Sequence, residues 1–71
     1  MERKRLAAEY NGIICKIEED KPEVGAYLYV FMPDGTQYDY LQNTLLDCQE
    51  FALEELSIPL NRWQNAPSVF V

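Results

Sequence analysis

The amino-acid sequence predicts an α+β fold: a three-stranded antiparallel sheet followed by one helix packed on one face (β-β-β-α), with a short C-terminal turn and tail. Segments rich in β-branched and aromatic residues come first, and a single stretch with helical apolar spacing follows them. A chain of 71 residues provides one domain with one core, so these elements must pack against each other. Within this single domain, we expect residues 1–8 and 65–71 to be flexible.

The first strand is predicted over residues 9–18. Ile13, Cys15 and Ile17 recur there at every second position, which is the period of a strand. Residues 18–23 are charged and contain a proline, so we expect them to form an exposed connection.

The second strand is predicted over residues 26–32, where strand propensity is highest. Tyr27, Tyr29 and Phe31 fall on one face, and aliphatic side chains fall on the other. Apolar residues on both faces are typical of a central strand covered on both sides.

Residues 33–36, Pro-Asp-Gly-Thr, predict a turn that leads into a third strand over residues 36–41. The pairing register of this hairpin stays open. A two-residue loop places Tyr38 opposite Phe31, whereas a three-residue loop places Tyr38 opposite Val30. Because side chains alternate along a strand, the choice decides which face of the sheet carries each residue of the third strand.

The helix is predicted over residues 45–56. Asn43 or Thr44 can cap its first turn, and Pro59 stops it soon after its last turn. A further turn at residues 61–64 would fold Trp63 onto the edge of the core, and residues 68–71 would form either a frayed tail or a late edge strand. The expected core consists of Ile13 or Ile14, Ile17, Leu28, Val30, Leu45, Cys48, Ala52 and Leu56.

The charge distribution argues against nucleic acid as a partner. The net charge is −6, and from Leu6 onward three basic residues face eleven acidic ones. The first residues lack the apolar core of a signal peptide and no later segment is long enough to span a membrane, so we expect a cytoplasmic protein. In that compartment Cys15 and Cys48 are expected to be reduced, buried thiols.

No catalytic, cofactor or metal site is predicted. The chain has no histidine, which removes the usual general base and the commonest zinc ligand. The acidic run at residues 18–23 lacks the spacing of a calcium loop. Asp39 is a single carboxylate without a catalytic partner, and Cys48 has no neighbouring cation that would activate its thiol.

Aromatic side chains provide the candidate interface. One helix can shield only one face of a sheet, so part of the aromatic set is expected to lie uncovered and to meet another surface. The alternative is that the N-terminal segment, Trp63 or the tail covers these rings. The candidate interface residues are Tyr27, Tyr29, Phe31, Tyr38 and Tyr40.

Two resemblances accompany these patterns. Residues 42–48 (Gln-Asn-Thr-Leu-Leu-Asp-Cys), continuing through Ala52, resemble the strand-to-helix junction of HicB-type antitoxin domains, and the strand order within residues 26–56 is similar. Residues 9–64 also resemble small uncharacterised bacterial proteins with a Tyr-rich hairpin, a Thr-Leu helix start and a Pro-to-Trp ending. The HicB family usually adds a DNA-binding segment, which does not follow here, so the resemblance implies neutralisation by contact.

Three functions are therefore expected, in order of preference. The first is a non-enzymatic module that binds a protein or forms a homodimer through its aromatic face. The second is an antitoxin or immunity protein whose acidic surface caps a basic toxin. The third is a small-ligand binder with a cleft between Trp63, Tyr38 and the helix end.

Overall fold

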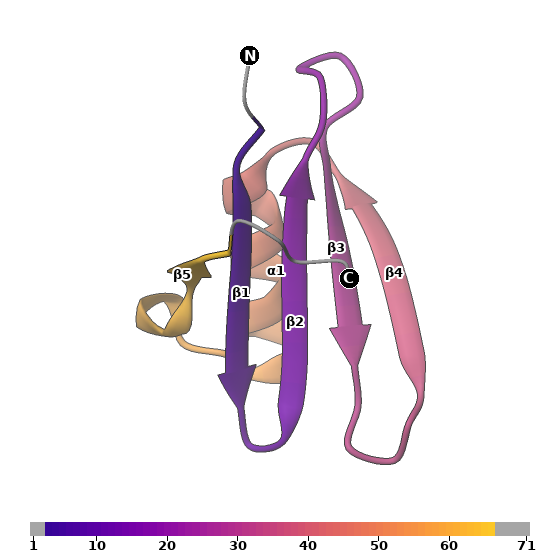
Figure 1. Ribbon diagram of the computed structural model, residues 1–71, viewed down its shortest axis with the longest axis vertical. Coiled ribbons are helices and arrows are strands. Elements are labelled where there is room, and N and C mark those ends of the chain that lie inside the picture. The colour runs from indigo at the N-terminus through magenta and orange to yellow at the C-terminus, as the bar shows by residue number, and fades with distance from the viewer. Residues whose placement is uncertain (1–2, 67–71) are drawn as a thin grey trace.

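The computed structural model describes residues 3–66 and shows an antiparallel sheet with one helix, α1, across one face (Figure 1). The elements are β1 (Arg5–Tyr10), β2 (Ile13–Glu19), β3 (Ala26–Phe31), β4 (Gln37–Gln42), α1 (Leu45–Leu56), a 3₁₀ turn η1 (Leu60–Arg62) and β5 (Gln64–Asn65). The strand order is β4-β3-β2-β1-β5. The α+β prediction is confirmed, but the sheet has five strands rather than three.

The predicted first strand is wrong because it spans a hairpin. Asn11 and Gly12 both have positive φ, 54° and 80°, which a two-residue turn of the I′ type requires. The chain reverses there, and Tyr10 pairs with Ile13. Residues 5–8, expected to be flexible, form most of β1, because Leu6 buries its side chain in the core.

The hairpin between β3 and β4 has the three-residue loop. The backbone N–H of Met32 donates to the carbonyl oxygen of Thr36 at 2.8 Å, and Gly35 takes a positive φ of 93°. This closure sets Val30 opposite Tyr38. Of the two registers that the sequence allowed, the structure therefore has the second.

Helix α1 confirms the predicted range, residues 45–56. The Thr44 hydroxyl accepts a hydrogen bond from the backbone N–H of Asp47 at 3.0 Å, which caps the first turn. At the other end Ser57 adopts a left-handed φ of 60°, and the N–H of Ile58 donates to the Ala52 carbonyl oxygen at 3.2 Å. This termination turns Ile58 into the core, where it is fully buried.

The core lies between the sheet and α1. Five of the expected core residues are buried, namely Ile17, Leu28, Val30, Cys48 and Ala52. Leu45 and Leu56, at the two ends of α1, are only partly buried, as is Ile13, and Ile14 lies on the opposite face with 40% of its surface exposed. The buried residues that the sequence did not indicate are Leu6, Ala8, Ala26 and Ile58.

The segment after α1 closes the other edge of the sheet. The turn η1 includes residues 61 and 62 of the turn predicted at residues 61–64, and Trp63 packs against the core. Strand β5 pairs with β1 through Leu6–Asn65 and Ala7–Gln64, so a late edge strand exists but falls earlier than residues 68–71, which lie outside the described residues. Within residues 3–66, no helix is long and apolar enough to cross a membrane.

Candidate interaction surface

The sheet has one face covered by α1 and one face turned away from it, which no helix of residues 3–66 covers and which we term the open face. The strand registers place side chains on the open face in three rows that run across β1, β2, β3 and β4. The rows are Arg5–Glu18–Tyr27–Leu41, Ala7–Lys16–Tyr29–Asp39 and Glu9–Ile14–Phe31–Gln37. In Figure 1 this face is toward the viewer, with α1 behind the sheet.

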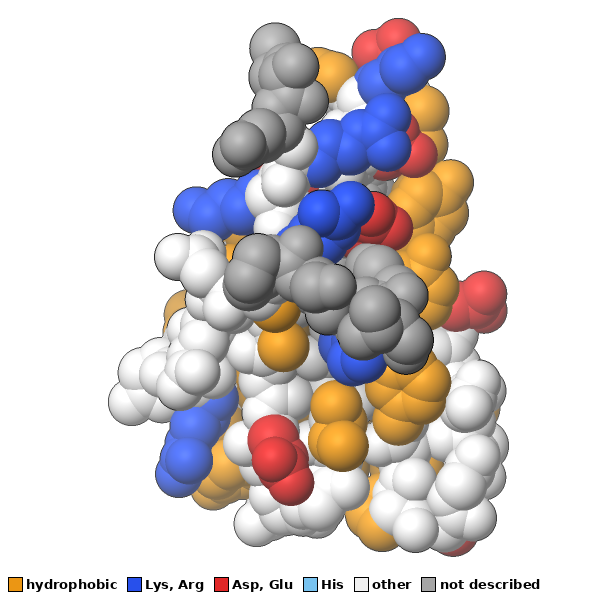
Figure 2. All heavy atoms as spheres, viewed as in Figure 1, with side chains coloured by type: hydrophobic (Ala, Val, Ile, Leu, Met, Phe, Trp, Pro, Cys, Tyr) orange, Lys and Arg blue, Asp and Glu red, His pale blue; other side chains and the backbone are white. Residues whose placement is uncertain are grey.

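Apolar side chains form the centre of the open face. The rings of Tyr27 and Tyr29 stack with centroids 6.3 Å apart at an interplanar angle of 25°. Leu41 beside Tyr27 is 55% exposed, and Ile14 flanks Phe31 on the other side. We call Ile14, Tyr27, Tyr29, Phe31 and Leu41 together the aromatic strip. They are separate from the hydrophobic core, and Figure 2 shows hydrophobic side chains among charged ones on this face.

Charges of both signs border the aromatic strip. Arg5 contacts the Glu18 carboxylate from the neighbouring strand through two nitrogens, at 3.0 and 3.1 Å. The ammonium of Lys16 lies 5.5 Å from the centroid of the Phe31 ring, within cation–π range. Burial, and then the negative charge of Glu18, raises the pKa of Tyr29 above its ordinary value, so this phenol is neutral at pH 7.

The structure divides the predicted interface between the two faces. Tyr27, Tyr29 and Phe31 lie on the open face, but Tyr38 and Tyr40 lie on the face that carries α1. The ring of Tyr40 packs against Phe51 of α1 with centroids 4.6 Å apart. The three-residue hairpin loop is the cause. Compared with a two-residue loop, it shifts the pairing of β4 by one residue and so moves each β4 side chain to the other face of the sheet.

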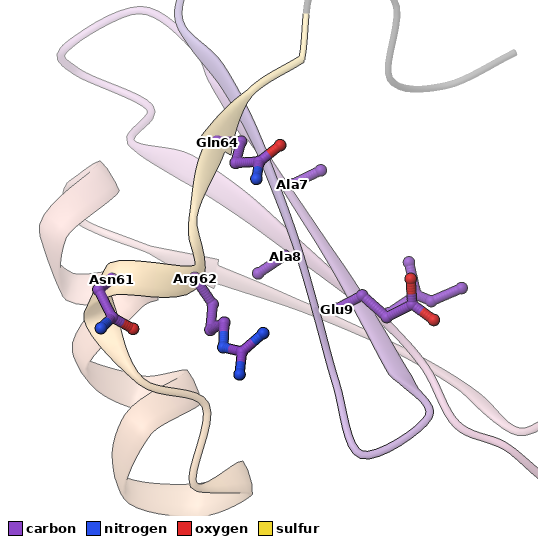
Figure 3. A pocket seen from close by; sticks show the side chains of 7 residues that line it. Ala7, Ala8, Glu9, Asn61, Arg62 and Gln64 are labelled. Carbon is purple, nitrogen blue, oxygen red and sulfur yellow. The ribbon is translucent and has the colours of Figure 1, made fainter.

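A shallow hollow of about 600 Å³ lies between η1 and β1, next to the start of β5 (Figure 3). Arg62 of η1 and Glu9 of β1 line it, and the Arg62 guanidinium lies 5.1 Å from the Tyr10 ring centroid. The expected cleft between Trp63 and Tyr38 does not form. Trp63 directly precedes β5 and Tyr38 lies on β4, so the two side chains belong to opposite edges of the sheet.

The two thiols are buried and unsuited to nucleophilic chemistry. Burial raises the pKa of Cys15 to about 11, and burial together with the charge of Asp47 raises the pKa of Cys48 to about 11. The Cys48 thiol donates to the carbonyl oxygen of Ala26 at 3.6 Å. Neither thiol forms a disulfide.

We predict that both thiols react slowly in the folded protein. Labelling by a maleimide or a disulfide reagent at pH 7.5 should require opening of the fold, since the reactive thiolate is almost absent at that pH. Addition of denaturant should accelerate the labelling by orders of magnitude. Labelling of the native protein at the rate of a free cysteine would contradict the buried positions.

The acidic run between β2 and β3 is divided among separate contacts. Glu18 pairs with Arg5, and Asp20 lies 3.7 Å from Arg3. Among residues 3–66, no three His, Cys, Asp or Glu side chains lie close enough together to hold a metal ion.

Comparison of the chain with protein-family models, with curated proteins and with solved structures gives no match.

Proposed function

We propose that the protein is a non-enzymatic binding module that forms a homodimer through the aromatic strip on its open face. One observation carries the proposal: three rings of β3 and two flanking aliphatic side chains lie on the side of the sheet opposite α1. Burial of apolar surface is the main driving force of association, and tyrosine is enriched among residues that dominate binding energy.

The charge pattern favours a second copy as the occupant of this face. Arg5 and Lys16 lie on the open face together with Glu9, Glu18 and Asp39, so both signs are present there. Two copies can therefore meet with opposite charges facing each other. The α1 side is different, because α1 contributes acidic residues and no basic ones, so two such surfaces would repel each other.

A second candidate is neutralisation of a basic toxin, in keeping with the resemblance to HicB-type domains. Residues 22–61 contain seven acidic residues and no basic residue, and such a surface attracts basic proteins. A toxin-like gene adjacent to this one, together with binding of its product, would support this candidate over the homodimer.

The proposal predicts that Tyr29→Glu disrupts self-association. A charge at the centre of the aromatic strip should raise the dimer dissociation constant by about 30-fold or more, which corresponds to losing a hot spot of about 2 kcal/mol. Analytical ultracentrifugation over a range of concentrations measures this constant. Tyr38→Glu is the matched control, because Tyr38 is 48% exposed on the opposite face and its replacement should leave the constant unchanged.

Chemical denaturation of the same variants distinguishes an interface from an internal surface. If the wild type is monomeric at high concentration and Tyr29→Glu destabilises it as much as a core substitution does, the aromatic strip is covered within the chain. Phe70→Asp in the full-length protein tests this alternative, since residues 69–71 are apolar and lie outside the described residues. For a homodimer interface, Phe70→Asp should change the unfolding free energy by less than about 0.5 kcal/mol.

A further inference from the structure

The free main-chain edge of β4 is a second surface, which shares only Leu41 with the aromatic strip. Strand β4 is the outermost strand in the order β4-β3-β2-β1-β5, and among residues 3–66 no strand pairs with its outer side (Figure 1). The opposite edge is different, because β5 pairs with β1 and the N–H of Ala66 donates to the Arg5 carbonyl oxygen at 3.0 Å.

The hairpin register identifies the backbone groups that point outward from β4. The hydrogen bond from Met32 to Thr36 makes these two residues a bonded pair, and bonded and non-bonded pairs alternate along an antiparallel ladder. Tyr38, Tyr40 and Gln42 therefore direct their N–H and C=O groups toward β3. The N–H and C=O groups of Gln37, Asp39 and Leu41 point away from the sheet, as three donors and three acceptors along about 14 Å.

Among residues 3–66, this edge carries no lysine, proline, bulge or covering element, and its only charged side chain is that of Asp39. Natural edges are commonly protected by lysine, proline, a bulge or a covering element, and β4 has the sequence Gln-Tyr-Asp-Tyr-Leu-Gln with regular pairing throughout. Two of its side chains, Tyr38 and Leu41, are about half exposed, at 48% and 55%. An extended segment can therefore add to the sheet here through main-chain hydrogen bonds.

The charge around the edge indicates the chemistry of that segment. Asp39 is the one charged residue of β4 and lies at its centre. On α1, Asp47 and Glu55 lie one turn before and one turn after Phe51, the residue that packs against Tyr40 of β4. Strands β3 and β4 and helix α1 contain no lysine or arginine, so the edge favours a basic segment.

A second copy of the chain fits this edge poorly. Consider two β4 strands that pair antiparallel with both helices on one side of a continuous sheet. If Gln37, Asp39 and Leu41 of each copy all form hydrogen-bonded pairs, Asp39 lies opposite Asp39 of the other copy. Like charges directly opposite each other destabilise a sheet. A shift of two residues avoids that repulsion but leaves only two bonded pairs.

We propose that the β4 edge binds an extended basic peptide segment of a partner protein, which adds to the sheet beside Gln37, Asp39 and Leu41. Lysine or arginine would lie opposite Asp39 on the open-face side. Apolar residues at the alternate positions would lie beside Tyr38 and Tyr40 on the α1 side. The proposal goes beyond dimerisation through the aromatic strip, because it depends on the outward backbone groups of β4 and not on the rings of β3.

A synthetic peptide, acetyl-Thr-Lys-Val-Lys-Val-Lys-Thr-amide, tests the proposal with the full-length protein. It should bind at least about tenfold more tightly than the same peptide with glutamate in place of lysine, because three side-chain charges change sign. Amide hydrogen exchange measured by NMR should slow at Gln37, Asp39 and Leu41 when the peptide is bound. N-methylation of the three lysine nitrogens should abolish binding, whereas N-methylation of the two valine nitrogens, which face away from β4, should preserve it.

Charge variants of the protein provide the second arm. Asp39→Lys should reverse the preference in favour of the glutamate peptide, and Glu9→Gln on β1, remote from β4, should change the affinity less than twofold. Equal binding of the lysine and glutamate peptides would overturn the proposal, as would full binding by the peptide methylated on its lysine nitrogens. Protection of the same three amides that rises with protein concentration alone would also overturn it, because it would show that a second copy occupies the edge.

Discussion

Gly25→Ala is expected to lower the free energy of unfolding by about 3 kcal/mol or more. Two effects contribute, because alanine rarely adopts the positive φ of this position and because its Cβ would be overpacked. Gly25 ends the connection between β2 and β3 with a φ of 115°, and a Cβ atom there would overlap the backbone carbonyl oxygen of Gln42. A carbonyl within the sheet cannot move aside without breaking the β3–β4 pairing near Ala26. Because a domain of this size is stable by only about 4–10 kcal/mol, urea denaturation followed by circular dichroism should detect the loss readily.

Gly35→Ala is the matched control for this substitution. Gly35 also has a positive φ, 93°, but no atom lies within 4 Å of the position that its Cβ would take. Gly35→Ala should therefore lower the free energy of unfolding only by the cost of the positive φ for alanine, about 1 kcal/mol. Equal losses at the two glycines would show that the close approach to Gln42 does not contribute.

Ile17→Ala is expected to cost about 2–5 kcal/mol through lost burial and the cavity that remains. Ile17 is fully buried on β2, beneath α1 and opposite Leu28. Ile14→Ala on the same strand removes the same atoms from the other face, where the side chain is 40% exposed. In the monomer, Ile14→Ala should lower the free energy of unfolding by less than about 1 kcal/mol, because a partly exposed side chain gains less free energy from burial on folding. Similar costs for the two isoleucines, measured by denaturation at low protein concentration, would contradict the assignment of the faces.

Local signals predicted the parts of the fold that local chemistry controls. Thr44 and Asp47 form the expected cap, and the positions of the buried helical stripe follow from the 3.6-residue period. The dipeptide Asn11–Gly12 is also a strong hairpin signal, but the alternation of Ile13, Cys15 and Ile17 favours a single strand that extends back across it. Strand β5 is only two residues long, and its position depends on tertiary contact with β1, which no local pattern encodes.

The candidate site could be predicted in part. Alternation alone placed Tyr27, Tyr29 and Phe31 on one face, and this grouping is confirmed. The faces of Tyr38 and Tyr40 depend on one loop residue, and the Pro-Asp-Gly sequence is compatible with both loop lengths. Leu41 and Ile14 were missed because their membership of the strip depends on pairing across strands rather than on neighbours in the sequence.

The order of the strands also bears on how the chain reaches its native state. Each of the four long strands lies beside its neighbour in the sequence, so most of the sheet assembles from consecutive hairpins between residues close in the chain. Such local topology favours rapid folding, because little loop-closure entropy is lost before contacts form. The exception is the pairing of Leu6 with Asn65, which joins the two ends of the described chain and must wait until α1 has returned across the sheet. We therefore expect the strand that protects one edge to form last, which would leave both edges of the sheet accessible to other chains until it does.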